Sequence, residues 1–108
     1  MSFKVGDLVF AKVRGFPAWP SRITAIPASS GTRFSVMFYG TYEVATVNEN
    51  NVWTFSPVNE KRFATKTHLR KEKFADGMRE IQSTPEVIRF NDAVSDNRDI
   101  DGNADIEN

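Results

Sequence analysis

Cysteine is absent from the 108 residues of the sequence, and histidine occurs once, as His68. A chain without thiols cannot build a disulfide scaffold, a thiolate zinc site or a cysteine nucleophile, and a lone imidazole lacks partners for a metal site. No run of residues approaches the roughly 20 apolar positions that a membrane helix needs, and the N-terminus lacks the apolar core of a signal peptide. We therefore expect a soluble, intracellular protein that contacts no membrane and uses neither a metal nor another cofactor.

The formal net charge of zero hides an asymmetry along the chain. Residues 91–108 contain six acidic side chains against Arg98, a balance of −5, so residues 1–90 carry +5. The acidic tail has few large apolar residues, and such a segment does not offset the entropy of its own ordering. We expect one folded domain over residues 1–90 and a disordered acidic tail over residues 91–108.

Short runs of β-prone residues, separated by turn-forming residues, predict five strands in the first half of the chain. The expected strands cover about residues 8–13, 19–26, 33–39, 43–47 and 52–55. In the third run, Phe34, Val36 and Phe38 alternate with Arg33, Ser35 and Met37, so the two sets occupy opposite faces. Five short strands joined by tight loops favour a small barrel over an open sheet.

The pattern changes at Ser56-Pro57, where serine can cap a helix and proline suits its first position. This signal predicts a short helix over about residues 57–64. A longer helix is expected over about 69–82, because Phe74, Met78 and Ile81 form one apolar stripe at helical spacing. Thr84-Pro85 repeats the capping signal and predicts a last short turn that runs to Phe90. The fold class is therefore mainly β, with a five-stranded barrel over about 3–55 and a small helical bundle over 57–90.

The segment Gly15-Phe16-Pro17-Ala18-Trp19-Pro20 places a tryptophan between two prolines, directly after a strand and a glycine turn. Proline fixes φ and has no N–H, so this connection is stiff and presents its rings in a fixed array. A plainer interpretation makes Trp19 a lid on the barrel, and most single aromatic residues here would simply pack in a core. Trp53 and Phe55 are expected to be structural.

The sequence resembles the PWWP domain family, whose motif stands here as Pro17-Ala18-Trp19-Pro20. Residues 3–13 resemble the family's first strand, and residues 36–43 resemble its third strand and the following turn. The resemblance covers about residues 3–90 and is closest to the branch of hepatoma-derived growth factor and lens-epithelium-derived growth factor. It implies a Tudor-like, or SH3-like, five-stranded barrel with a C-terminal helical bundle.

The resemblance also implies a ligand, histone H3 di- or trimethylated at lysine 36, held in an aromatic cage. The positions that match the cage are Phe16, Trp19 and Phe38, with Val13 at its edge, and those beside the histone tail are Glu43 and Thr41. Val13 stands where the nearest relatives have methionine, so this wall is smaller and less polarisable. Ala18 also departs from the bulkier residue common there, at a position that lies outside the cage in the family.

The family contacts nucleosomal DNA beside the histone tail, and six basic positions match that role. They are Lys12, Arg14, Arg33, Arg70, Lys71 and Lys73, the last three expected on the longer helix. Contact with phosphates needs only charge and reach, so DNA binding should be independent of sequence and sensitive to salt. A plainer interpretation of the helix charges is an ordinary solvated face.

The first hypothesis is therefore a nuclear, chromatin-associated reader of methylated histone H3, which regulates transcription together with other chromatin proteins. The runner-up is a nonspecific DNA-binding or protein-docking barrel that does not discriminate methylation. A third is a barrel that grips arginine-methylated or proline-rich peptides. The sequence shows no nucleophile–base pair and no phosphate-binding glycine loop, so no enzymatic activity is expected. Asp7 and Asp76 are interpreted as turn and helix-surface acids.

Overall fold

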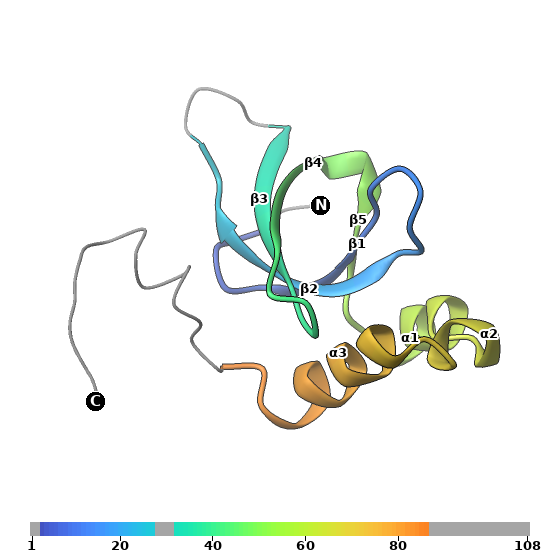
Figure 1. The fold of residues 1–108 in the computed structure, drawn as a ribbon. Helices are drawn as coiled ribbons and strands as arrows, with labels where there is room; N and C mark the ends of the chain where they lie inside the picture. Colours follow the sequence, from blue (N-terminus) through green and yellow to red (C-terminus); the bar gives the residue numbers. More distant parts are fainter. Residues whose placement is uncertain (1–2, 28–31, 87–108) are drawn as a thin grey trace.

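Five antiparallel strands form one curled sheet in the computed structural model, which describes residues 3–27 and 32–86 (Figure 1). The strands are β1 (Leu8–Ala11), β2 (Trp19–Ala25), β3 (Arg33–Phe38), β4 (Val44–Asn48) and β5 (Val52–Thr54). Their order in the sheet is β4-β3-β2-β1-β5. The 3-10 helix η1 (Glu49–Asn51) joins the two edge strands directly. The expected fold class, a five-stranded barrel with helices after it, is confirmed.

Helix α1 (Pro57–Phe63) begins where the sequence predicts. The Ser56 hydroxyl accepts a hydrogen bond from the Asn59 amide, and Pro57 occupies the first turn, where its missing N–H costs nothing. The predicted helix, about residues 57–64, ends one residue after the observed helix. The expected capping signal at Ser56-Pro57 is thereby confirmed.

The second predicted helix is wrong at its beginning, because the segment from residue 66 to residue 83 contains two helices. Thr65 caps the short α2 (Lys66–Leu69), and α3 (Glu72–Ser83) begins only after Lys71, which has extended backbone. The break lets α2 fold back toward α3, so that the His68 ring lies 5.6 Å from the Phe74 ring. A heptad-like stripe cannot reveal such a break, because Phe74, Met78 and Ile81 all lie in α3 and are buried there.

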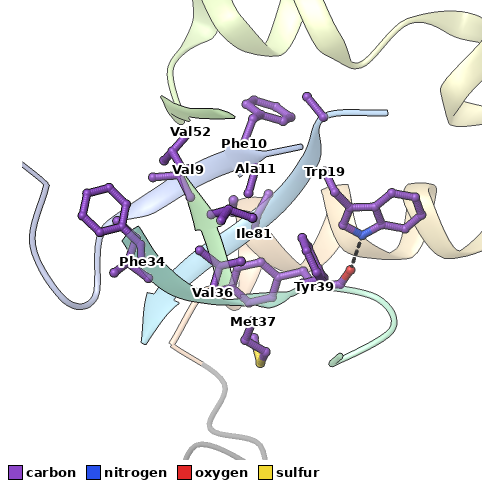
Figure 2. Close-up of a cluster of buried hydrophobic side chains, with 14 of the residues drawn as sticks. Val9, Phe10, Ala11, Trp19, Phe34, Val36, Met37, Tyr39, Val52 and Ile81 are labelled. Carbon is purple, nitrogen blue, oxygen red and sulfur yellow. Dashed lines mark hydrogen bonds between the residues drawn. The ribbon is translucent and has the colours of Figure 1, made fainter. Parts of the chain in front are cut away.

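Both faces of β3 are covered, which explains why its alternation is incomplete. Phe34, Val36 and Phe38 are buried on one face as predicted, but Met37 on the other face is fully buried too (Figure 2). The segment that follows α3 reaches this second face, since the Arg22 guanidinium donates to the Pro85 oxygen at 3.2 Å and the Tyr39 hydroxyl donates to the same oxygen. The predicted short turn begins at Pro85, and its continuation to Phe90 lies outside the described residues, as does the acidic tail.

A close approach of two glycines joins α3 to the barrel. A Cβ atom added to Gly40 would stand 2.3 Å from the Lys73 oxygen, and one added to Gly77 would stand 2.7 Å from the Tyr39 oxygen. Only glycine fits at either position, and Gly40 also has a φ of 91°. This contact seats α3 directly behind the turn that follows β3.

Candidate binding pocket

Six side chains surround an open cavity of about 70 Å³ at one end of the barrel. They are Val13, Phe16, Trp19, Phe38, Thr41 and Glu43. The structure thus brings together the four positions that match the family's cage and the two that match its histone contacts. The lining is apolar apart from Thr41 and Glu43, so the cavity suits a group that is bulky, weakly hydrated and positively charged.

One half of the pocket comes from the connection between β1 and β2. Gly15 has a φ of 89°, which permits the chain to reverse, and the Phe16 amide donates to the Val13 oxygen at 3.1 Å to close the turn. The Phe16 side chain stands at the rim and is 58% exposed. Ala18 is buried and does not line the cavity.

Trp19 is the inner wall and also belongs to the core, with 9% of its surface exposed. Its indole nitrogen donates a hydrogen bond to the Tyr39 oxygen at 2.7 Å (Figure 2). Its ring meets the Phe74 ring of α3 edge to face, with 5.1 Å between centroids. A tryptophan held at both ends presents one fixed face to the cavity.

The other half of the pocket is Phe38 and the turn that follows it. Tyr42 has a φ of 63°, which is unusual for a residue with a side chain, and its amide donates to the Phe38 oxygen at 2.8 Å. The Glu80 carboxylate of α3 accepts the Gly40 amide at 2.9 Å and the Tyr42 hydroxyl. The turn that carries Thr41 and Glu43 is therefore clamped from behind by a charged side chain.

Glu80 is a site-supporting residue that the sequence did not indicate. Its partners lie 38 and 40 positions away in the chain, and a single glutamate on a helix carries no local pattern. Gly77 in the interior of the predicted helix is the one signal that could have indicated a close contact here, because glycine in a helix interior costs about 1 kcal/mol.

The six predicted DNA contacts are all exposed, but they do not form one cluster around the pocket. Lys12 and Arg14 belong to the loop that carries Phe16, whereas Arg33 begins β3 at the end opposite Phe38, about 17 Å away by strand rise. Arg70 caps α2 and Lys71 caps α3, so the expectation that both lie on the longer helix is wrong. Lys73 alone of these three lies within α3.

The described residues contain neither a metal site nor a membrane-spanning helix. Within residues 3–27 and 32–86, no three side chains of His, Cys, Asp or Glu gather in a way that would hold a metal ion. The His68 ring instead contacts the Phe63 oxygen through Nδ1 at 2.8 Å. Among the helices in these same ranges, none has the length and apolar character needed to cross a membrane.

Comparison with protein families matches residues 6–86 to the PWWP domain. The chain belongs to the PWWP domain family. PWWP domains are binding modules rather than enzymes, and they are typically associated with chromatin and bind methylated lysine or DNA. The motif that names the family is the segment here that places Trp19 in the wall of the pocket.

Several curated relatives of this PWWP domain are proteins of Arabidopsis thaliana. The chain is 32% identical over 97 residues to Protein HUA2-LIKE 3 and 34% identical over 99 residues to Protein HUA2-LIKE 2, and 86% of the chain is covered each time. It is 33% identical over 82 residues to ENHANCER OF AG-4 protein 2, with 71% of the chain covered. The chain spans only 6–7% of the length of these relatives.

Among solved structures, a PWWP domain from Schizosaccharomyces pombe has the same fold. The two chains superpose with a TM-score of 0.60 and share 23% sequence identity. The match covers 79% of this chain and 89% of the yeast chain. The barrel and its C-terminal helices are therefore shared with that domain.

Proposed function

We propose that this PWWP domain reads histone H3 methylated at lysine 36 on nucleosomes, in the nucleus, and contacts the nearby DNA without sequence preference. The observation that carries the proposal is the cavity lined by the rings of Phe16, Trp19 and Phe38, with the Glu43 carboxylate beside them. The narrower likeness to the branch of hepatoma-derived growth factor stays a prediction, since the relatives above are HUA2-like proteins.

The chemistry of the pocket favours a methylated ammonium. A trimethylated lysine cannot donate hydrogen bonds, but its charge is attracted to the negative faces of aromatic rings, by about 2 kcal/mol per desolvated contact. The cavity of about 70 Å³ is far below the roughly 300 Å³ at which pockets for drug-sized ligands begin. It therefore suits a single small head group whose chain continues outside.

The surroundings of the cavity favour a basic peptide as the carrier of that head group. Glu43 lies on the lining and is exposed, so its carboxylate can meet a positively charged tail without losing its hydration. Because ordering a flexible tail consumes most of the gain, the peptide alone should bind weakly, on the order of millimolar. The choice of lysine 36 among histone lysines rests on the family resemblance.

DNA contact would raise this weak affinity. Arg14 extends from the same loop as Phe16, so a nucleosome that offers a methylated lysine near its DNA can engage the ring and the cation together. Two weak contacts on one rigid body reinforce each other, since the second forms at high effective concentration. Association with other chromatin proteins would come from the longer chains in which such a domain occurs.

The test is a titration of nucleosomes with and without a trimethylated analogue at H3 lysine 36, at two salt concentrations. We expect the methylated particle to bind about tenfold more tightly, a ratio that corresponds to about 1.4 kcal/mol. Raising the salt should weaken both complexes while the ratio is kept, because phosphate contacts and ring contacts are separate. Equal affinity for both particles would refute the reader function and leave the nonspecific DNA-binding or docking barrel.

A point variant makes this test specific to the pocket. Phe16→Ala removes an exposed wall and should abolish the difference between the two particles while the fold and most of the DNA affinity are kept. Val58→Ala is the control, because Val58 is also an exposed apolar side chain, 76% exposed on α1, and does not line the cavity. If the Phe16→Ala variant still prefers methylated nucleosomes, the methylated lysine binds at another site.

A further inference from the structure

Lys12 makes a contact that its expected role in DNA binding does not explain. Its ammonium nitrogen lies 2.7 Å from the Phe16 oxygen and 3.3 Å from the Val13 oxygen and donates to both. These two residues stand on opposite sides of one turn, and both line the cavity. A single charged group therefore ties together the two ends of the turn that forms one half of the pocket.

The backbone around this turn shows why such a tie matters. Within the turn, the Phe16 amide donates to the Val13 oxygen, and Gly15 holds a positive φ that glycine can also leave easily. The Phe16 ring is mostly exposed, so packing against neighbours restrains it little. The position of this ring thus depends on how well its backbone is held.

The base of the loop is anchored separately. The Lys12 amide donates to the Asn51 oxygen of η1 at 2.9 Å, which fixes the Cα atom of Lys12 against the barrel. From this fixed point the side chain reaches forward along the turn to the Phe16 oxygen, four residues ahead. The hydrogen bonds of Lys12 therefore connect the exposed tip of the pocket wall to the barrel.

We propose that Lys12 is a positioning residue of the pocket, which holds the Phe16 wall in place through the Val13 and Phe16 carbonyls. The proposal rests on the methyl-lysine function proposed above. An ammonium group has three donors, so two serve the turn and one stays available to solvent or to a phosphate. A hydrogen bond from a charged group to a carbonyl contributes about 1 kcal/mol or more, so losing this tie should weaken methyl-lysine binding about fivefold.

The decisive experiment compares Lys12→Met with Arg14→Met in binding to an H3 peptide trimethylated at lysine 36, without DNA. Both variants remove one positive charge from the same loop, but no hydrogen bond or ion pair of Arg14 is seen among the described residues, so Arg14→Met is a matched control. Loss of positive charge by itself should strengthen the binding of a basic peptide. The positioning role predicts the opposite sign for Lys12→Met alone, about fivefold weaker, and recovery in Lys12→Arg, which keeps the donors.

A second measurement does not depend on any ligand. In the unbound protein, the ¹⁵N order parameters of the Gly15 and Phe16 amides should fall in Lys12→Met from about 0.85 toward 0.6, and stay unchanged in Arg14→Met. If the wild-type domain does not bind the peptide but the order parameters fall in Lys12→Met, the reader function is refuted, whereas the positioning of Phe16 by Lys12 is supported. If Lys12→Met keeps both the order parameters and the peptide affinity of Arg14→Met, the positioning role is overturned.

Discussion

The indole nitrogen of Trp19 donates a hydrogen bond of 2.7 Å to the backbone oxygen of Tyr39 (Figure 2). This bond joins the beginning of β2 to the residue after β3, so it connects the two halves of the pocket across the sheet. The Phe74 ring of α3 contacts the same indole edge to face. The central ring of the pocket is thus positioned by the core of the domain rather than by its loops.

Trp19→Phe should lower both stability and methyl-lysine affinity. The variant keeps an aromatic ring but loses the N–H that the Tyr39 oxygen accepts, at a cost of about 1–3 kcal/mol in the free energy of unfolding. Phenylalanine is also a weaker partner for cations than tryptophan. Urea unfolding and titration with the trimethylated H3 peptide measure the two effects.

Trp53→Phe is the control for that substitution. Trp53 also contacts a phenylalanine ring, with 5.0 Å between its centroid and that of Phe63, but it does not line the pocket. Its peptide affinity should equal that of wild type. Unchanged stability and affinity in Trp19→Phe would show that the bond to Tyr39 does not position the ring.

Gly77→Ala should destabilise the domain by about 1–3 kcal/mol, although alanine is the better helix former. The added Cβ would stand 2.7 Å from the Tyr39 oxygen and 3.1 Å from Cγ of Pro20, so α3 must move away from the barrel. Helix propensity alone predicts the opposite sign, a gain of about 1 kcal/mol. A thermal melt decides between them, and a rise in Tm would mean that α3 is not seated as described.

The parts of this fold that follow from local chemistry could be predicted from the sequence. The strands follow from alternation, as with Phe34, Val36 and Phe38, and α1 follows from Ser56-Pro57. The grouping of the Phe16, Trp19 and Phe38 rings was predicted from the family resemblance, and in the structure all three line one cavity. Contacts between distant segments had no local signal. The approach of Gly40 to Gly77, like the extended backbone at Lys71 that divides the longer helix, depends on how α3 meets the barrel.

Glu80→Ala should loosen the turn that carries Thr41 and Glu43. The carboxylate accepts hydrogen bonds from the Gly40 amide and the Tyr42 hydroxyl, so its removal should cost about 1–3 kcal/mol of stability and weaken binding of the methylated peptide severalfold. Denaturant midpoints and peptide titrations report the two losses.

Glu72→Ala removes the same charge from the exposed first turn of α3 and controls for electrostatics. A basic peptide should lose only a small, screened long-range attraction in Glu72→Ala, so a severalfold greater loss in Glu80→Ala reports the clamp. Equal peptide affinities in the two variants would show that the clamp does not shape the pocket.

The joint between α2 and α3 should bind DNA independently of the pocket. Arg70 and Lys71 are exposed, and neither lines the cavity, so changing both to Gln should leave the affinity for the trimethylated H3 peptide unchanged. If each cation neutralises one phosphate, the slope of log affinity against log salt for duplex DNA should become shallower by about 1.8.

Arg33→Gln tests the opposite end of β3, where the structure separates this cation from Lys12 and Arg14. A slope unchanged by the double variant but reduced by Arg33→Gln would place the DNA on the far side of the barrel, where it could not reinforce a lysine bound between Phe16 and Trp19.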